Sequence, residues 1–418
     1  MTGLDRRTGR HRHRGAAEPT TAGHGHGHGP AEPSSRRVRR LLVAILVPVA
    51  LATLFGVWLT WPGAVPTSTA DVGFGQGGPV HGDVLDAAAA PCTDGGPATP
   101  GQGDKCVALS VRLTDGDSPG ATIRQVLPNE PSTPHFTAGD HVVLGYTGGN
   151  PSDPGSYQIQ DFQRGTPMLW LAALFVVAVL LLGRWRGLAS LLALGFSFLV
   201  LVVYLFPALL SGEDPVIVGV LAAGVIMFGV LYLTHGISAQ TSSAVLGTVL
   251  SLALIGVLGT AFSAATQLTG LDDDTGNLIR VLGHGVDARG LLLAGMVIGA
   301  LGVLDDVTVT QTSAVWELRR ANPDLGARAL YTAALRIGRD HISSAVNTLA
   351  LAYAGAALPV LLIYSVAGQS FGTVVTTQNI AQEVVRTLVG SIGLVAAVPV
   401  TTAIAAVVAR QDKIELTA

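Results

Sequence analysis

The sequence predicts an all-α polytopic membrane bundle of about eight transmembrane helices, with a small extracytoplasmic β domain between helices one and two. Three observations support this prediction. The 418-residue chain is 49% hydrophobic and only 13% charged, whereas soluble domains usually carry about 25% charged residues. Apolar segments of spanning length recur through most of the chain, and a single Gly- and Pro-rich region separates the first from the rest. Arginine and lysine are concentrated in alternate connections.

The N-terminal segment 1–40 is rich in Arg, His, Gly and Pro, so it cannot bury a core, and we predict a disordered cytoplasmic tail. It contains "HGHGHG" at 24–29. Imidazole suits transition metals, but the intervening glycines leave such a site unstructured, and metal binding stays open. The apolar run 41–61 follows "RRVRR" without a convincing cleavage site, which favours a retained transmembrane anchor over a signal peptide.

Region 62–166 differs from its surroundings, because Gly, Pro, Asp and Thr dominate it. Short alternating stretches separated by turn residues predict about five strands in a small β-barrel or sandwich. These stretches are "HGDVLDA" (81–87), "CVALSVRL" (106–113), "ATIRQVL" (121–127), "HVVLGYT" (141–147) and "SYQIQDF" (156–162).

Seven further spans follow one another closely and predict a seven-helix transmembrane domain over 167–409, with a cytoplasmic C-terminus at 410–418. We expect them at 167–183, 187–210, 215–234, 241–264, 291–311, 341–364 and 384–409. With the first anchor running outward, the inner connections hold Arg184, Arg186, Arg319, Arg320, Arg328, Arg336, Arg339, Arg410 and Lys413. The outer ones hold only Arg280, Arg289 and Arg386, so the positive-inside rule places both termini in the cytoplasm.

This orientation places Cys92 and Cys106 on the outer side, where disulfides persist. A bridge across a loop of this length would stabilise the fold by roughly 3 kcal/mol. We predict this disulfide, and two unpaired thiols are the alternative.

Asp305 and Asp306 interrupt an otherwise apolar span. An aspartate at the centre of a membrane helix costs about 2.5–3.5 kcal/mol, whereas each Leu, Ile or Val returns only about 0.3–0.6 kcal/mol. Counting about 1.5 Å per residue from Leu291 places Asp305 roughly 21 Å into a core about 30 Å thick. Asn347 of the next span falls at a similar depth. The pair could therefore belong to a polar path through the bundle.

Polar residues around this pair extend the candidate path. The run "VTVTQTS" (307–313) is a poor lipid-facing helix, and we expect a broken or re-entrant element that lines a wet cavity. The alternative is that the aspartates end one helix and cap the next at headgroup level, or pair with Arg319 or Arg339. The transport-path candidates are Asp305, Asp306, Thr308, Gln311, Ser343, Asn347 and Thr348.

Small residues at four-residue intervals in the span 241–264 indicate close packing of helix backbones. They include Ser243, Gly247 and Ser251.

Three stretches of the chain resemble the YibE/F-like membrane proteins: "LTHGISAQTSSAVLGTVLSL" (233–252), "IGALGVLDDVTVTQTSAVWEL" (298–318) and "RIGRDHISSAVNTLALAYAGAALPVLL" (336–362). The resemblance runs from Gly82 to Val408 and leaves out the His-rich tail. It implies a multi-pass protein of the bacterial plasma membrane. It carries no settled biochemical activity.

No enzyme motif occurs: the chain has no HExxH helix, GxSxG elbow or GxxxxGK[ST] phosphate loop, and Val309 breaks a DDxxD pattern. We therefore expect no catalysis, cofactor, metal centre or nucleic-acid partner, and no ATP hydrolysis by this chain.

The preferred function is a secondary permease or ion-coupled transporter of unknown substrate. Its partners would be the lipid bilayer, a proton or cation and a small-molecule substrate, and a second membrane subunit stays open. In it Asp305 or Asp306 would bind the proton or cation, and Ser343, Asn347 and Thr348 would supply neutral ligands. The alternative is a membrane scaffold or envelope-assembly factor that displays the outer β domain.

Overall fold

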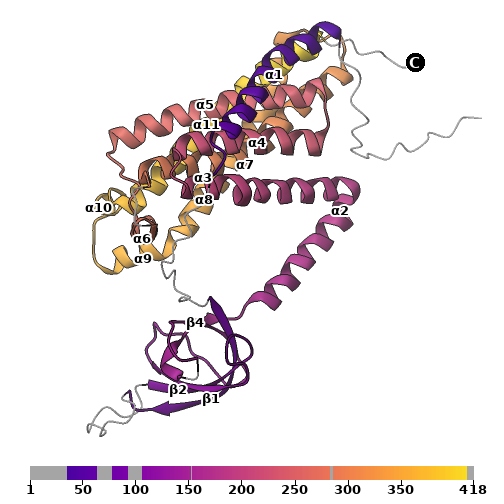
Figure 1. Cartoon of the computed structure of the whole chain (residues 1–418). Helices are drawn as coiled ribbons and strands as arrows, with labels where there is room; N and C mark the ends of the chain where they lie inside the picture. The colour runs from indigo at the N-terminus through magenta and orange to yellow at the C-terminus, as the bar shows by residue number, and fades with distance from the viewer. Residues whose placement is uncertain (1–34, 64–77, 93–105, 152, 283–285, 412–418) are drawn as a thin grey trace, which may run out of the picture.

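The computed structural model describes residues 35–63, 78–92, 106–151, 153–282 and 286–411 (Figure 1). Most of the tail predicted over 1–40, including its histidines, lies outside these residues, as does 412–418. The first helix, α1 (Arg36–Leu59), begins five residues before the predicted anchor. Ser35 caps it, since its side chain accepts a hydrogen bond from the backbone N–H of Val38.

The predicted strands are confirmed as one curled antiparallel sheet with the order β3-β2-β1-β4-β5. In each strand, alternate apolar residues point to one face and form a small core that includes Val84, Val111, Val142 and Leu144. A disulfide joins Cys92, just after β1, to Cys106 at the start of β2. The strands are β1 (Pro79–Ala90), β2 (Cys106–Leu113), β3 (Thr122–Pro128), β4 (His141–Tyr146) and β5 (Tyr157–Phe162).

Helices make up most of the remaining described chain, and most of them gather in one bundle (Figure 1). They are α2 (Gly165–Val200), a π-helical turn (Leu201–Leu205), α3 (Phe206–Leu210), α4 (Pro215–His235), α5 (Ala239–Ala265), α6 (Asp273–Leu282), α7 (Ala288–Ala321), α8 (Ala327–Ala356), α9 (Leu358–Val366), α10 (Phe371–Val375) and α11 (Gln378–Gln411). The short helix α6 lies in a connection where no helix was expected.

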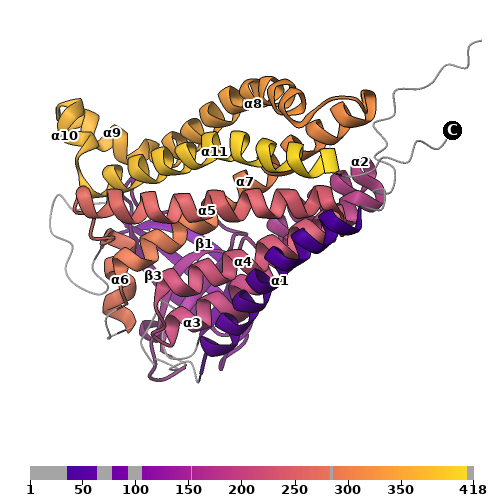
Figure 2. The same cartoon turned by 90° about the horizontal axis from the view of Figure 1, so that it is seen from above.

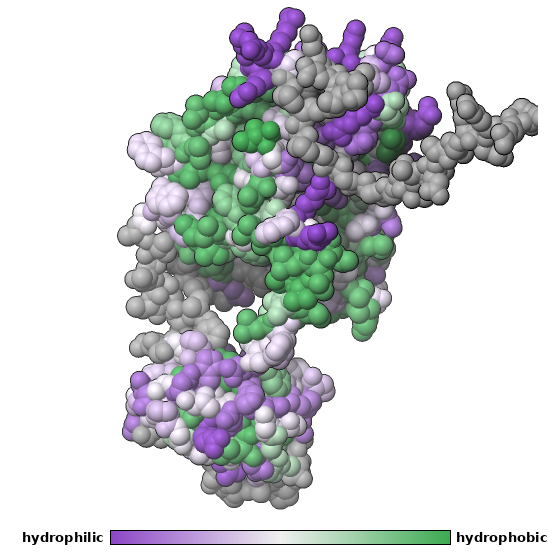
Figure 3. All heavy atoms as spheres, turned by 90° about the vertical axis from the view of Figure 1, so that its right-hand side faces the viewer, coloured by the Kyte–Doolittle hydropathy of each residue, from purple (hydrophilic) through white to green (hydrophobic). Residues whose placement is uncertain are grey.

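Six helices in the described residues are long and apolar enough to cross a membrane, and α8 with α9 makes a seventh if that bent pair counts as one span. On the face of the bundle seen in Figure 3, hydrophobic side chains lie between a hydrophilic end and the largely hydrophilic sheet domain. The chain therefore has the build of a membrane protein.

The two spans expected at 167–183 and 187–210 form one helical run over Gly165–Leu210. Arg184 interrupts it with the non-helical dihedrals φ 49° and ψ −128°. At this point the run turns sharply, so that its first half leads away from the sheet and its second half joins the bundle (Figure 1). The kink lies in the basic connection that was expected to separate the two spans.

The helix α7 occupies the middle of the bundle, where it contacts α4, α5, α8 and α11 (Figure 2). The expectation of a broken element at 307–313 is wrong, because α7 continues without interruption to Ala321. The threonine hydroxyls there donate to carbonyls three or four residues earlier, so the helix itself satisfies them.

The break occurs instead between α8 and α9, whose axes differ by 60°. Pro359 stands in the first turn of α9, where its missing N–H costs nothing. The expected span 341–364 thus becomes a bent pair, and α8 begins well before it, at Ala327.

Candidate functional site

The two aspartates of α7 lie on different faces of the helix, because neighbouring residues on a helix point about 100° apart. Asp306 faces α8 and lines a cavity of about 480 Å³ between the two helices. Asp305 does not line this cavity, and its Oδ1 is buried. The pair therefore contributes to two different environments.

Polar and apolar side chains share the wall of the cavity between α7 and α8, called the α7–α8 pocket below. Three sequence-predicted residues, Asp306, Gln311 and Thr348, line it. Their polar neighbours in the lining are Thr310, His341 and Ser344, and the apolar part comes from Val303, Val307, Ala345, Leu349 and Ala352.

Gln311 joins the two helices beside the α7–α8 pocket. Its side-chain amide donates a hydrogen bond to the carbonyl of Ala334 on α8, at 2.8 Å. A Cβ built on Gly338 would come within 2.6 Å of Gln311 Oε1, so the absence of a side chain at Gly338 lets the helices approach here. The glutamine thus has a structural contact as well as a place in the pocket lining.

Ser343 and Asn347 are exposed on α8 and do not line the α7–α8 pocket. Asn347 therefore does not stand on the part of α8 that lines the pocket opposite Asp306. Its face differs: Thr348, the next residue, points into the pocket. The hydroxyl groups that α8 contributes to the pocket therefore come from Ser344 and Thr348 instead.

Thr308 is fully buried on the side of α7 that faces α5. Its hydroxyl lies 2.9 Å from the hydroxyl of Thr248. This contact, like Asp305, lies away from the α7–α8 pocket.

Neither aspartate forms an ion pair with Arg319. The Arg319 guanidinium instead donates to the backbone carbonyls of Pro323 and Leu325, in the turn between α7 and α8. Among the described residues, no salt bridge involves Asp305 or Asp306. The alternative in which the pair caps a helix end is wrong, since both residues stand near the middle of the continuous α7.

Three pocket residues, Thr310, His341 and Ser344, are not among the transport-path candidates, although the run 307–313 that contains Thr310 was expected to line a cavity. The signal for them was helical spacing. Thr310 follows Asp306 by four residues, Ser344 precedes Thr348 by four, and His341 precedes Ser344 by three. Residues at these intervals share a helix face, so fixing one pocket residue on each helix identifies the others.

The sheet carries a separate group of charged side chains on its exposed surface. Asp83 accepts a hydrogen bond from Arg112 at 3.3 Å and lies 2.7 Å from His141 Nδ1. The hydrogen bond with His141, helped by Arg112, holds the pKa of Asp83 below its usual value. His81 pairs in the same way with Asp115, at 2.5 Å.

The comparison with known families agrees with the helical part of this structure. A family model described as YibE/F-like protein matches residues 171–411, which is more than half of the chain. The chain belongs to the YibE/F-like family. In this family member the match spans α2 to α11 and does not reach the sheet, although the sequence resemblance was expected to begin at Gly82. No curated protein and no solved structure gives a match.

Proposed function

We propose that this YibE/F-like protein is a secondary permease whose substrate path includes the α7–α8 pocket. The observation that supports the proposal is a cavity of about 480 Å³ in which one carboxylate stands beside neutral polar groups and an apolar wall. This volume falls within the roughly 300–1,000 Å³ that is usual for small-molecule sites. An ionisable residue within a membrane helix is costly, so its presence favours a functional role.

The lining suggests the chemistry of the substrate. Asp306 supplies a negative charge, and Thr310, Ser344, Thr348 and the Gln311 side chain supply hydrogen-bonding groups. A small solute that carries a positive charge, such as an amine, fits this combination.

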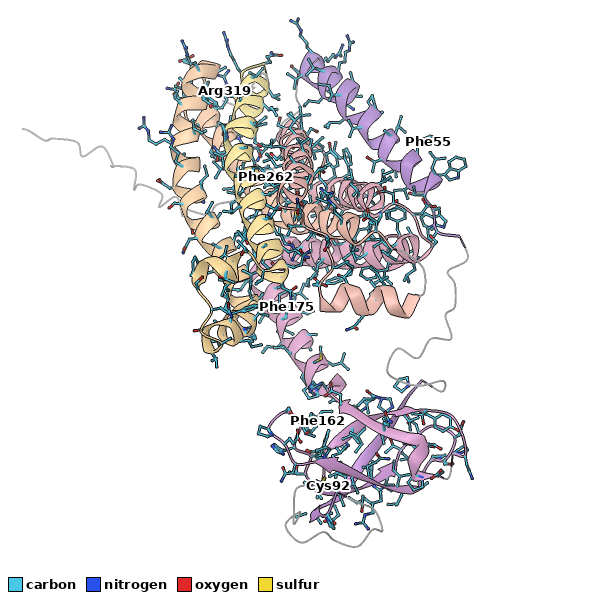
Figure 4. All side chains as sticks on the ribbon, turned by 90° about the vertical axis from the view of Figure 1, so that its left-hand side faces the viewer. Phe55, Cys92, Phe162, Phe175, Phe262 and Arg319 are labelled. Atoms are coloured by element: carbon cyan, nitrogen blue, oxygen red, sulfur yellow. A yellow bond between two sulfur atoms is a disulfide. The ribbon has the colours of Figure 1, made fainter. Side chains whose placement is uncertain are left out.

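We place eight spans in the bacterial plasma membrane, with both termini in the cytoplasm and the sheet outside. Dividing the run Gly165–Leu210 at Arg184, and counting α8 with α9 once, gives this number from the six apolar helices. Figure 4 supports the orientation, since Arg319 lies at the end of the bundle away from the sheet that carries Cys92. Basic residues prefer the cytoplasmic side, and disulfides persist outside it.

A flux measurement tests the proposal. Full-length protein in proteoliposomes is screened with small labelled amines and inorganic cations. For a transported solute, we expect Asp306→Asn to lower uptake at least tenfold, because one charge-assisted hydrogen bond is worth about 1.5–3 kcal/mol. Thr348→Val is expected to lower it less.

The matched control is Asn347→Ala, because Asn347 directly precedes Thr348 on α8 but does not line the pocket. It should leave uptake unchanged. Normal uptake by both Asp306→Asn and Thr348→Val would contradict the assignment of the pocket.

The alternative function, a membrane scaffold, is favoured by the charged group on the exposed surface of the sheet, around Asp83 and Asp115. Deleting the sheet region 62–166 separates the two functions in cells. If the protein is a scaffold, this deletion should abolish its function in cells and Asp306→Asn should preserve it. If the protein is a permease, Asp306→Asn should abolish that function.

A further inference from the structure

A second polar group lies on the other side of α7, where it packs against α5. Thr248 on α5 and Thr308 on α7 are both fully buried, and their hydroxyls lie 2.9 Å apart. Ser251 on α5 is also buried, with 2% of its surface exposed. The three hydroxyls therefore form a buried polar group between two apolar helices.

The register of the two helices brings Asp305 to the level of Ser251. Thr248 lies beside Thr308, and a Cβ on Gly259 would contact Leu293, so α5 and α7 run antiparallel. Ser251 is three residues after Thr248, and Asp305 is three residues before Thr308. Each therefore lies about one helical turn from the bonded threonines, in the same direction along the bundle. The serine hydroxyl and the carboxylate thus occupy the same layer.

These hydroxyls offer lone pairs, not protons, to the carboxylate. The Ser251 hydroxyl donates to the carbonyl of Gly247 at 2.8 Å, and that of Thr248 donates to the carbonyl of Ala244 at 3.1 Å. The Thr308 hydroxyl contacts Thr248 and the backbone carbonyl of Asp305, at 3.3 Å. Because each proton is already directed at another acceptor, the layer presents oxygen acceptors at the level of Asp305.

Two oxygens near this layer have no partner in the described chain. One is Asp305 Oδ1, which is buried. The other is the hydroxyl of Thr401 on α11, a residue with no exposed surface. This hydroxyl faces Gly247 of α5, next to Thr248. A buried carboxylate oxygen without a donor is strongly unfavourable unless a positive charge joins it.

Among the described residues, no basic side chain forms an ion pair with Asp305. The helix α5 has no charged residue, and α4 has only His235, at its C-terminal end. On α11, Arg386 pairs with Glu383 at 2.7 Å near the start of the helix, and Arg410 lies at its other end. On α8, His341 is the last residue that can carry a positive charge before the C-terminal end of the helix, and it lines the separate pocket. Asp306 on α7 lines that pocket too.

We propose that Asp305, Ser251, Thr248 and Thr308 form a binding site for one monovalent cation, Na⁺ or a proton, separate from the α7–α8 pocket. One carboxylate balances one positive charge, and a hard cation prefers oxygen ligands. If the permease function proposed above holds, this is the site of the coupling ion, while Asp306 faces the substrate. The two adjacent aspartates then have different roles because they point to different sides of α7.

Binding is tested without transport, on purified full-length protein in detergent. A ligand that binds only the folded state raises its melting temperature. For a Na⁺ site, we expect Tm to rise by several degrees in NaCl over choline chloride of equal ionic strength. The rise should be absent in Asp305→Asn and smaller in Ser251→Ala.

For a proton site, Na⁺ has no effect on Tm, and the pH dependence of Tm differs between wild type and Asp305→Asn. The matched control is Thr260→Val, because Thr260 lies on the same helix, makes the same bond to a carbonyl four residues earlier and is exposed. It should respond as wild type does.

The site is refuted if Asp305→Asn and Ser251→Ala follow wild type in both the Na⁺ and the pH series. Ser251→Ala keeps the test valid if Asp305→Asn does not fold. A Na⁺ or pH response that needs Asp305, in a protein without measurable flux, would retain the site and remove the permease function.

Discussion

Thr248 and Thr308, which are 60 residues apart in the chain, meet through their hydroxyls at 2.9 Å inside the bundle. The contact fixes the register of α5 against α7 and thereby the layer in which Asp305 lies. It also shows that the polar residues of α7 divide between two neighbours: one face meets α5, and the other meets α8 across the pocket.

We expect the two threonines to be coupled in stability. In a double-mutant cycle of Thr248→Val and Thr308→Val, the coupling free energy should be about 0.6 kcal/mol, the average for hydrogen bonds between membrane helices. Reversible unfolding of the purified protein in mixed detergent measures it. Thr260→Val, combined with Thr308→Val, should be additive, and coupling of equal size there would contradict the contact.

Gly247→Ala should destabilise the packing of α5 against α11. A Cβ at Gly247 would overlap the Thr401 side chain, and overpacking typically costs about 1–3 kcal/mol. Gly256→Ala is the matched control on the same helix, since nothing lies within 4 Å of its added Cβ. Thermal unfolding should rank Gly256→Ala at or above wild type and Gly247→Ala below it. The reverse order would be incompatible with this packing.

Asp83→Asn should weaken the sheet at neutral pH and have little effect in acid. His141 and Arg112 hold the pKa of Asp83 below its ordinary 3.8, so the ionised form is the one that the fold stabilises. That stability is present above about pH 4 and is lost as the pH falls through the lowered pKa.

Hydrogen exchange of the strand amides in the full-length protein, corrected for the intrinsic rate at each pH, measures this effect. Asp86→Asn, on the same strand and exposed, is the control and should leave the pH profile unchanged. A constant difference between Asp83→Asn and wild type from pH 7 to pH 3 would exclude the ion-pair explanation.

Cys92→Ser should destabilise the sheet by roughly 3 kcal/mol, the amount expected for a loop that joins residues 14 apart. Hydrogen exchange of β1 and β2 reports the loss. A reductant should bring wild type to the level of the variant and leave the variant itself unchanged. Equal protection of wild type with and without reductant would show that the bond adds nothing to the sheet.

The elements that could be predicted from sequence are those with a strong local pattern. Alternation located five strands within a few residues, and long apolar runs located the helices. The two spans on either side of Arg184 were not expected to form one helical run. Hydropathy shows where a charged residue interrupts an apolar segment, but it does not show whether the backbone stays helical there. The break expected at 307–313 does not occur, because the threonine hydroxyls there bond to carbonyls of their own helix. The bend lies instead between α8 and α9, just before Pro359.

The candidate site was harder to predict, since it depends on the rotation of each helix about its axis. The depth expected for Asn347 came from counting residues along each helix, which says nothing of the direction in which a side chain points. The face that Asn347 occupies depends on how α8 packs against α7, and that packing points Thr348 into the cavity. Likewise, the two aspartates look equivalent in sequence, and only the neighbours α5 and α8 distinguish them.

The Cys92–Cys106 bond has a practical consequence for mapping the protein in living cells. Because these are the chain's two cysteines, the wild-type protein provides a native label for topology without engineered tags. If the sheet is exported, alkylation of intact cells leaves both sulfurs unmodified until a reducing agent is added. A sheet retained in the cytoplasm would instead keep free thiols, so one gel-shift assay reads the sidedness of the whole molecule.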